Sequence, residues 1–497
     1  MSRRPLDPRE RRSLAVVLAV AAVARAAVVL WASSRIVPTA DAVYYHKLAT
    51  RLAAGAGYTW LWPDGVVTFA AHYPVGYPWL LSLVYRLVGP VPAAGALLNA
   101  ALALAGVAAV WDLTRRSAGL RAAWLAGLLA ALDPALVLYT PALMTEGVTA
   151  SLLALAAWAA AVAHDRSPYG TSGDAPPPRP WPWLLAAGAL LGLATLVRPQ
   201  CVLVAPLLGW AAWRARGSLA VTGAALAVVL PWTLRNCTRM GRCALVSVNG
   251  GWNLLIGAGP NANGHWAPVD VPPACREVFD EAGKDACFGE AARQMIAADP
   301  GRWLRLVPAR LGATFDYCGA GPWYLHDAAP DAFPDAAKVT AGAAETLIHR
   351  LMLAAALVAL ARWPGGLRRT RLAIGAAGVA LALVRPGWVA YALLAALAAL
   401  VWASGRPRSF VAAALFAVLG TTLAVHAAFF GAGRYSLVVF PLMASAVGAL
   451  LTARPRQGDT APHAPDRDGR GGAAASPGHR ERPVALQRRE DRAGNPG

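Results

Sequence analysis

Asp41 is the residue of this chain best placed to do chemistry. It stands about ten residues beyond the first long apolar segment, in the run Pro38–His46, and two tyrosines follow it closely. A carboxylate gains nothing from lipid contact, but at a membrane surface it can take the proton of an incoming hydroxyl group, which contributes about 10²–10⁴-fold to a rate. The structural alternative is that Asp41 caps a helix over residues 42–54.

Further charged side chains stand where apolar segments end. Glu146 lies between two such segments, and Arg198 and Arg434 lie close to the ends of others, as does Arg235, a weaker candidate. An arginine at the bilayer centre costs roughly 2.5–3.5 kcal/mol, so one at the outer end of a span is tolerated and can grip a phosphate with two hydrogen bonds. The structural alternative for each arginine is that its side chain only extends toward the membrane interface. The structural alternative for Glu146 is a favourable interaction with the dipole of the helix that it begins.

A divalent metal is an alternative partner of Asp41. His46 and His72 flank the same stretch and could complete a ligand set with that carboxylate. Histidines in aromatic loops more often form local hydrogen bonds, so we predict no metal site and no certain cofactor. The Gly-rich run Asn249–Asn253 lacks the lysine of a phosphate loop, which favours tight turns there.

The composition indicates a membrane protein that crosses the bilayer many times. Of 497 residues, 57% are hydrophobic and only 15% are charged, whereas soluble domains carry roughly 25% charged residues. The net charge of +19 does not indicate a nucleic-acid partner, because the arginines cluster in short loops at 115–121, 214–216, 362–371 and 406–408. Such loops mark the cytoplasmic side. A cleaved signal peptide is the rival interpretation of the first apolar segment, but no clear cleavage site follows it.

We therefore predict an all-α fold with about twelve transmembrane helices and both termini in the cytoplasm. The helices are expected near residues 14–32, 93–113, 121–139, 147–164, 182–197, 200–214, 218–235, 343–361, 372–385, 388–403, 409–430 and 436–453. The arginine-rich loops then all fall on the side of the N-terminus.

The same pattern divides the chain into five parts. They are a cytoplasmic N-terminus at 1–13, a transmembrane core at 14–235 with a first outer loop at 33–92, a small mixed outer-face domain at 236–340, a C-terminal transmembrane bundle at 341–453, and a disordered cytoplasmic tail at 454–497. The tail is assigned from its composition, since it is rich in Arg, Gly, Pro and Asp with almost no apolar clusters.

Most cysteines fall in or beside the predicted outer domain, which suggests disulfides in an oxidising compartment. These five are Cys237, Cys243, Cys275, Cys287 and Cys318. The pairs nearest in sequence are Cys237 with Cys243 and Cys275 with Cys287, although spacing does not fix the connectivity. A zinc site is the alternative, but no CxxC or HxxxH spacing is present. Cys201 is expected to be buried in a span.

Several short motifs, in their order and placement, resemble the bacterial GT-C-fold glycosyltransferases that use polyprenyl-phosphate sugars. The motifs are Asp41–Tyr58, His72–Leu81, Met144–Glu146, Leu196–Pro199, Pro231–Asn236, Ser247–Leu254 and Gly433–Tyr435 with Pro441. The second of them is similar to a Tyr-Pro-Pro-Gly-Tyr-Pro motif in which Val75 replaces one proline. The superfamily includes protein O-mannosyltransferases and aminoarabinose lipid A transferases, and the resemblance covers about residues 14–453.

This resemblance implies an inverting transfer of a sugar from a polyprenyl phosphate to a hydroxyl group of a lipid, glycan or protein, on the outer face of the cytoplasmic membrane. Asp41 is then the base, and Glu146 either orients the acceptor or balances an arginine. The remaining implied site residues are Arg198, Arg434 and Tyr435 at the donor phosphate, and Tyr45, His72 and Tyr73 in the loop that faces the acceptor.

Two departures from the family pattern bear on this assignment. Many relatives carry Asp-Glu where this chain has Asp41 and Ala42, so a second acid at that point is lost or moved. The aminoarabinose branch carries Glu-Lys-Pro where this chain has His72–Pro74, which argues against that branch. A transporter or flippase of lipid-linked or small solutes is the alternative from another class, although the sequence shows no two-half repeat. A noncatalytic family member is a third interpretation.

Overall fold

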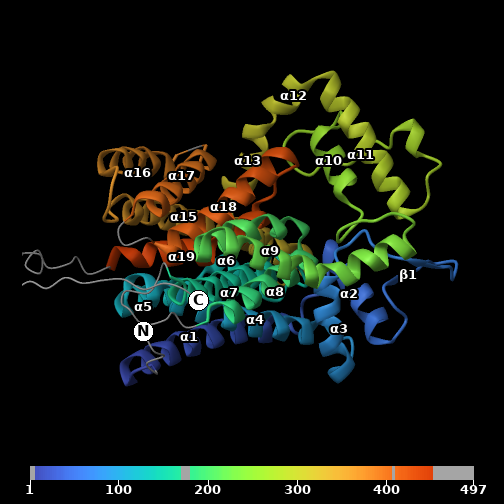
Figure 1. The fold of residues 1–497 in the computed structure, drawn as a ribbon. Coiled ribbons are helices and arrows are strands. Elements are labelled where there is room, and N and C mark those ends of the chain that lie inside the picture. Colours follow the sequence, from blue (N-terminus) through green and yellow to red (C-terminus); the bar gives the residue numbers. More distant parts are fainter. Residues whose placement is uncertain (1–5, 169–178, 385, 406–408, 452–497) are drawn as a thin grey trace, which may run out of the picture. The chain divides into compact units, whose positions relative to one another are not determined.

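The computed structural model describes residues 6–168, 179–384, 386–405 and 409–451, and these described residues belong to one compact unit. The predicted disordered tail at 454–497 therefore lies outside the described residues. Helices dominate: an antiparallel pair of three-residue strands, in which Trp60 faces Thr68, is the one sheet that the described ranges contain. The prediction of an all-α membrane fold is confirmed (Figure 1).

Each predicted span coincides with helical structure. The helices are α1 Pro8–Ala32, α4 Pro92–Ala118, α5 Leu120–Leu132, α6 Pro134–Leu138, α7 Thr145–Asp165, α8 Trp181–Val197, α9 Val204–Arg239, α15 Asp335–Ala361, α16 Arg368–Ala382, α17 Trp388–Ser404, α18 Phe410–Ala428 and α19 Phe440–Gly448. Six stretches of the described chain are long and apolar enough to cross a membrane, and four shorter apolar helices accompany them. By this criterion the number of about twelve spans is not confirmed.

Helix α9 contains a sharp turn where the sequence predicts the boundary between two spans. Trp213 has φ −151° and ψ 48°, and Arg214 has φ 48° and ψ −143°, so neither residue is helical. The two halves approach closely across Gly209 and Gly217, since a Cβ added to Gly217 would lie 2.2 Å from the Gly209 carbonyl oxygen. Glycine is required there because no side chain fits between the backbones.

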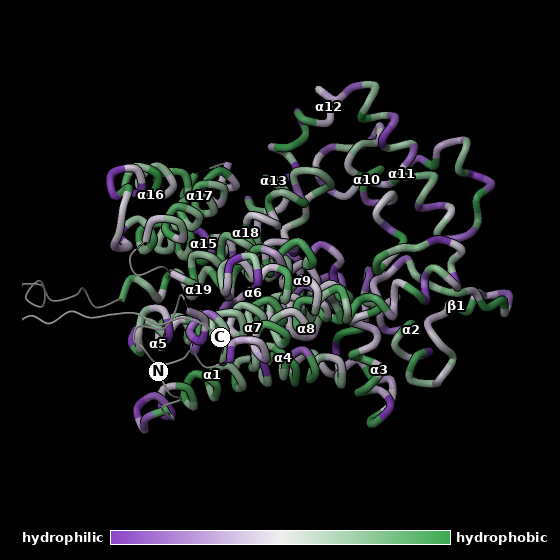
Figure 2. The backbone as a smooth tube through the Cα atoms, viewed as in Figure 1, coloured by the Kyte–Doolittle hydropathy of each residue, from purple (hydrophilic) through white to green (hydrophobic). Residues whose placement is uncertain are grey.

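Helix α7 forms the centre of the bundle. About 78% of an 18-residue apolar stretch of this helix is buried, and the helix packs against α4, α8 and α9. Its sequence is rich in alanine, which lets neighbouring helices approach closely in a membrane. Hydrophobic residues follow the bundle helices, whereas hydrophilic segments gather around α11 and near β1 (Figure 2). A buried central helix gives a rigid base for the polar residues at its first turn.

Two groups of elements belong to the segments that connect the bundle helices. The segment predicted as the first outer loop folds into α2 Asp41–Ala53, β1 Thr59–Leu61, β2 Val67–Phe69 and α3 Gly76–Val88. The segment predicted as the outer-face domain, residues 236–340, contains α10 Gly250–Ala258, α11 Glu281–Ala298, α12 Pro300–Arg305, α13 Val307–Phe315 and α14 Ala320–Ala328, with a short 3-10 turn at Pro273–Cys275. Some of these elements, such as α13 and α14, also pack against the bundle. Helices α10 and α11 lie on the same side of the bundle as α2 and β1 (Figure 1).

The second outer segment is helical and not mixed. Residues 236–340 are fully described and contain no strand. The Gly-rich run predicted as turns begins α10 instead, because the apolar face of that helix packs against Phe288 and Ala292 of α11. The strands belong to the first loop, where alternating aromatic and β-branched residues surround a tight turn.

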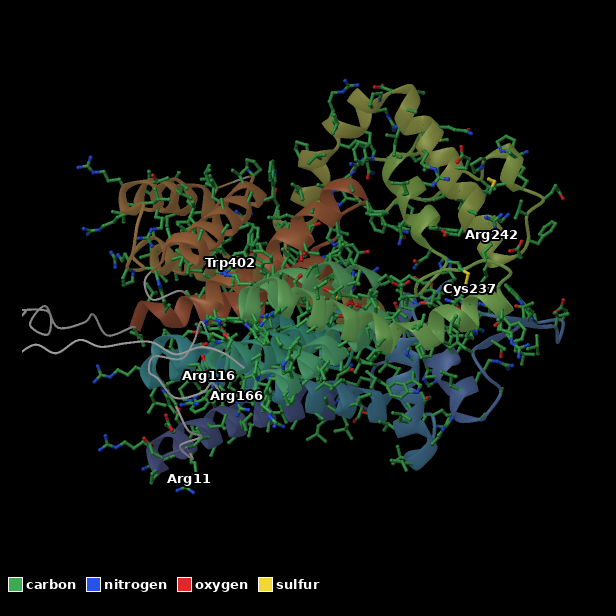
Figure 3. The ribbon with its side chains drawn as sticks, viewed as in Figure 1. Arg11, Arg116, Arg166, Cys237, Arg242 and Trp402 are labelled. Atoms are coloured by element: carbon green, nitrogen blue, oxygen red, sulfur yellow. A yellow bond between two sulfur atoms is a disulfide. The ribbon has the colours of Figure 1, made fainter. Side chains whose placement is uncertain are left out.

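Both predicted disulfides are present, between Cys237 and Cys243 and between Cys275 and Cys287, and Cys201 and Cys318 are free and buried. The zinc alternative is therefore wrong. Cys237 and Arg242 lie at one end of the helices, and Arg11 and Arg116 lie at the other (Figure 3). The disulfide of Cys237 thus lies at the opposite end of the helices from Arg11 and Arg116.

Candidate active site

Asp41 is the first residue of α2, and it does not cap that helix. Ala40 occupies the N-cap position, with φ 51° and ψ −133° and no side-chain cap hydrogen bond. A non-glycine residue rarely adopts this conformation, and such strain persists only where the surroundings enforce it. The capping interpretation of Asp41 is therefore wrong, and its carboxylate is directed to other partners.

Two carboxylates and two guanidinium groups alternate in one cluster. Arg434 Nη2 lies 3.0 Å from Asp41 Oδ2, and Arg434 Nε lies 3.4 Å from Glu146 Oε1. Arg198 Nη1 lies 2.8 Å from the same Glu146 oxygen. The cluster brings together the starts of α2 and α7, the end of α8, and the 3-10 turn Gly433–Val438 between α18 and α19. We call these four residues the ion cluster.

The two carboxylates of the ion cluster differ in burial. The Glu146 side chain is 1% exposed and the Asp41 side chain is 32% exposed. A buried carboxylate is tolerated only when it is paired and hydrogen-bonded. Glu146 meets this condition through both arginines and through the hydroxyl of Tyr139, which donates to Oε2 at 3.2 Å. A substrate can therefore reach Asp41, whereas Glu146 faces its own protein partners.

Tyr435 supports both arginines from one side. Its ring centroid lies 4.8 Å from the guanidinium carbon of Arg198 and 5.3 Å from that of Arg434, distances at which a cation is attracted to an aromatic face. His426 stacks on the Tyr435 ring at 4.4 Å, and its Nδ1 lies 2.9 Å from the Phe430 carbonyl oxygen. This platform fixes the two guanidinium groups beside each other without a further acid.

The aromatic residues of the first loop surround Asp41. The Tyr73 hydroxyl donates to Asp41 Oδ1 at 3.4 Å. Burial, with Asp41 and Tyr45 nearby, raises the pKa of Tyr73 above its ordinary value, so the hydroxyl stays protonated and remains a donor. The ring of Tyr45 packs edge-on against Tyr73 at 5.3 Å and is buried, and the ring of His72 lies 5.5 Å from Trp252 of α10. Of the three loop residues, Tyr73 alone makes a polar contact with the ion cluster.

A close contact between α3 and α8 brings Tyr73 near Arg198. A Cβ added to Gly76 would lie 2.5 Å from the Leu196 carbonyl carbon and 2.6 Å from the Val197 nitrogen. Only glycine permits this approach of the two backbones. The start of α3 is thereby held against the end of α8, two residues before Arg198.

Arg235 does not join the ion cluster. Its Nη1 donates to the Ala70 carbonyl at 2.8 Å and its Nη2 to the Tyr58 carbonyl at 2.9 Å. The guanidinium group therefore fastens the first outer loop to the end of α9. The phosphate-binding interpretation that the sequence allowed for Arg235 is replaced by this structural one.

The residues considered for a divalent metal do not converge. His46 Nδ1 lies 2.9 Å from the Tyr85 hydroxyl, and burial lowers the pKa of His46. Within the described ranges, no three His, Cys, Asp or Glu side chains come together in a group that could hold a metal ion. Asp41 instead has an arginine as its cationic partner.

A cavity adjoins the ion cluster between α7, α9 and α18. Its lining includes Arg198, Tyr435 and His426 together with polar and apolar side chains: Thr149, Leu153, Gln200, Cys201, Val204, Val418, Thr421, Thr422 and Val438. The arginine and the polar groups share this cavity with apolar side chains. Its volume of about 20 Å³ is enough for about one water molecule.

Tyr139 and His426 are the contacts of the site that the sequence did not suggest. Both fall inside predicted spans, where an aromatic residue gives no sign of a polar partner. The polar start of the following helix, with Glu146 seven residues after Tyr139, is the signal that points to Tyr139. His426 has no comparable signal beyond its place near the end of a span.

The central part of the chain matches a known family. Residues 72–234 match the family model described as dolichyl-phosphate-mannose-protein mannosyltransferase. No curated protein sequence matches the chain.

The solved structures that match the chain are distant in sequence. The oligosaccharyltransferase of Archaeoglobus fulgidus with a tethered acceptor peptide is 16% identical, with 88% of this chain and 49% of that chain covered and a TM-score of 0.46. ArnT from Cupriavidus metallidurans bound to undecaprenyl phosphate is 18% identical, with 88% and 76% covered and a TM-score of 0.37. The chain spans about half the length of the oligosaccharyltransferase.

The matched segment contains Tyr73, Glu146 and Arg198, three residues of the geometry described above. Over residues 72–234 the chain thus has the sequence pattern of the dolichyl-phosphate-mannose-protein mannosyltransferase family, and over this segment the resemblance predicted from its motifs is confirmed.

Proposed function

We propose that this protein is an inverting glycosyltransferase that moves a sugar from a polyprenyl-phosphate donor to an acceptor hydroxyl group. The observation that carries the proposal is the ion cluster, in which the reachable carboxylate of Asp41 pairs with Arg434, and Glu146 joins Arg434 to Arg198. The family match over residues 72–234 supports the reaction class.

The proposed reaction needs one base and one anion site. The acceptor hydroxyl gives its proton to Asp41 while its oxygen forms a bond to the anomeric carbon of the sugar. The bond from that carbon to the phosphate oxygen breaks, and the phosphate leaves with the electron pair. Because the departing phosphate is already a stabilised anion, it needs cationic partners more than it needs a general acid. Arg434 and Arg198 supply these cations.

The burial of Glu146 favours direct displacement with inversion. A double displacement would need a second reachable carboxylate as nucleophile. Glu146 is 1% exposed and is engaged by Arg198, Arg434 and Tyr139, so we assign it to holding the arginines. Of the two roles that the family resemblance allowed, balancing an arginine is the one that this geometry supports.

Donor binding would also free the base. Arg434 uses Nη2 for Asp41 and Nε for Glu146, and neither contact involves Nη1. A phosphate arriving at Arg434 competes with Asp41 for the guanidinium group. The Asp41 carboxylate then loses part of its ion pair when the donor is in place, and it can accept the proton of the acceptor.

We place the reaction on the outer face of the cytoplasmic membrane, with both termini in the cytoplasm and a lipid, glycan or protein as acceptor. The arginine-rich end with Arg11 and Arg116 and the disulfide end with Cys237 support this orientation (Figure 3). Asp41 belongs to the loop group on the side of the disulfides, since that loop bonds directly to α9 and α11.

The transporter alternative has less support. The charged groups of the ion cluster are at helix ends, where Asp41 begins α2, Glu146 is the second residue of α7 and Arg198 ends α8. Transport sites typically lie near the middle of the bilayer, in interrupted helices. Substrate counterflow by purified protein in liposomes, without any product, would favour transport over transfer.

Mass spectrometry of envelope lipids, glycans and secreted proteins from a deletion strain tests the proposed function. We expect one class of molecule to lose the mass of a sugar, and the wild-type chain to restore it. The mass and its carrier identify the sugar and the acceptor together. An unchanged envelope in the deletion strain would contradict the proposal.

A further inference from the structure

The first outer loop is fastened to the second outer segment by its backbone. Arg235 holds the carbonyls of Tyr58 and Ala70, at 2.9 and 2.8 Å. The Val248 amide donates to the Ala71 carbonyl at 2.9 Å. The residues just before Tyr73 therefore have their carbonyls bound by the end of α9 and by the non-helical stretch that follows it.

The backbone amides of the same stretch, Ala71 and His72, are bound by one carboxylate, that of Glu281 in α11. Its Oε2 accepts from the amides of Ala71 at 2.6 Å and His72 at 2.9 Å, and its Oε1 accepts from the indole N–H of Trp60. Hydrogen bonds to an ionised acceptor are stronger than neutral ones. One side chain from far along the chain thus binds three donors of the first loop.

Glu281 is not needed by its own helix. Asp280 is the N-cap of α11, and its side chain accepts from the Gly283 amide at 2.6 Å. Both Glu281 oxygens are directed to the loop instead. The first turn of α11 therefore uses one acid to cap the helix and the next to hold the loop.

A second contact from the same helix reaches the loop through α10. Asp285, one turn after Glu281, accepts from the Trp252 amide at 2.9 Å. The Trp252 ring lies 5.5 Å from the ring of His72. Both faces of the short stretch Ala71–His72 are thus fixed by α11, directly through Glu281 and indirectly through Trp252.

This stretch ends at the hydroxyl donor of the base. Tyr73 follows His72 directly, and its hydroxyl donates to Asp41 Oδ1. We propose that Glu281 is a positioning residue for the reaction: by holding the amides of Ala71 and His72, it places the Tyr73 hydroxyl against Asp41. The second outer segment then controls the geometry of the base. The catalytic part of this inference rests on the proposed function.

Hydrogen exchange of the full-length protein in detergent tests the contacts without any assay of activity. In Glu281→Ala the amides of residues 71 and 72 should exchange at least about 10-fold faster, because each loses an ionised acceptor. Glu290→Ala is the matched control, since Glu290 lies on the same helix and contacts only Arg293 and Gln294 of that helix. In Glu290→Ala the amides of residues 71 and 72 should exchange as in the wild type.

Two exchange results would overturn the proposal. Unchanged exchange at residues 71 and 72 in Glu281→Ala would show that the carboxylate does not hold the loop. A uniform increase across the bundle helices would show that Glu281 supports the fold as a whole. Glu281→Gln, which keeps one acceptor oxygen, should give an exchange rate between those of the wild type and Glu281→Ala.

A double-mutant cycle tests whether Glu281 acts through Tyr73. The readout is the initial rate at which membranes carrying each variant form the product that the deletion strain lacks. Glu281→Gln and Tyr73→Phe should each lower this rate about 10-fold, because each removes a hydrogen bond to a charged group. The double variant should again be about 10-fold slower, since both changes remove one shared interaction.

The outcomes of the cycle are distinct. A double variant about 100-fold slower than the wild type would show independent effects and contradict the positioning role. Glu290→Gln should keep the wild-type rate. If the wild-type chain forms no product, the proposed function fails while the exchange experiment still decides whether Glu281 holds the loop.

Discussion

Asp41 and Glu146 both pair with Arg434, yet their surroundings favour different roles for the two carboxylates. Asp41 has one guanidinium partner and the Tyr73 hydroxyl, and its side chain is partly exposed. Glu146 has two guanidinium partners and the Tyr139 hydroxyl, and it is buried. The exposed acid can exchange its partner for a substrate, whereas the buried acid keeps the arginines in place.

This difference predicts that neutral substitutions at the two positions lower the free energy of unfolding by unequal amounts. Glu146→Gln should lower the free energy of unfolding by about 3 kcal/mol, because it leaves two arginines without their buried counter-charge. Asp41→Asn should lower it by less than about 1 kcal/mol, since an exposed ion pair contributes little. Thermal unfolding of both variants in the same detergent checks the comparison. Equal midpoints would show that Glu146 does not organise the cluster.

The residues of the ion cluster could be selected from the sequence, but their pairing could not. Asp41, Glu146, Arg198 and Arg434 stand out because charge is rare beside apolar segments. No local pattern shows that Arg434 bridges Asp41 and Glu146, since the three come from distant parts of the chain. Tyr139 and His426 were missed because aromatic residues inside spans normally serve packing.

At the scale of elements, close backbone contacts decide which side chains meet. The contact of Gly76 with Leu196 and Val197 joins the start of α3 to the end of α8. Tyr73 precedes the first element and Arg198 follows the second. The loop and the helix end therefore reach the ion cluster as one unit, and neither could be moved alone.

Gly76→Ala tests this contact. The added Cβ would lie 2.5 Å from the Leu196 carbonyl carbon, so we expect α3 to shift and the free energy of unfolding to fall by about 1–3 kcal/mol. Gly223→Ala in α9 is the control, because its Cβ meets nothing within 4 Å and alanine favours a helix. Thermal unfolding measures both. A Gly76→Ala variant as stable as Gly223→Ala would contradict the contact.

The observed helix boundaries can be compared with the span boundaries predicted from the sequence. The break inside α9 falls at Trp213 and Arg214, the last two residues of the span predicted at 200–214. The span predicted at 121–139 is divided into α5 and α6, because Asp133 caps the second helix and Pro134 begins it. Proline there was visible in the sequence, but the apolar run on both sides favoured one continuous helix.

At the scale of the whole molecule, Arg11 and Arg116 lie far from the disulfide of Cys237. Arg11 and Arg116 lie at one end and Cys237 and Arg242 at the other (Figure 3). The clustering of arginine in a few short loops is visible in the sequence, and the orientation that it predicts stays a prediction. The attachment of the first loop to α11 through Glu281 could not be predicted, because it joins segments separated by most of the core.

Cysteine labelling tests the proposed orientation. Asp64 in the turn between β1 and β2 and Arg11 at the start of α1 are both exposed. A membrane-impermeant maleimide should label D64C in intact cells, and it should label R11C only after the membrane is opened. Labelling of R11C in intact cells, with D64C protected, would place the loop that holds Asp41 in the cytoplasm and reverse the orientation.

The central claim is that the Asp41 carboxylate takes the proton of the acceptor. Its most direct test is the amount of product, measured by mass spectrometry, in the deletion strain that carries Asp41→Asn at the expression level of the wild-type chain. Loss of a general base predicts a fall of at least about 100-fold, while binding of undecaprenyl phosphate by the purified variant is retained. Product equal to that of the wild type would contradict the mechanism.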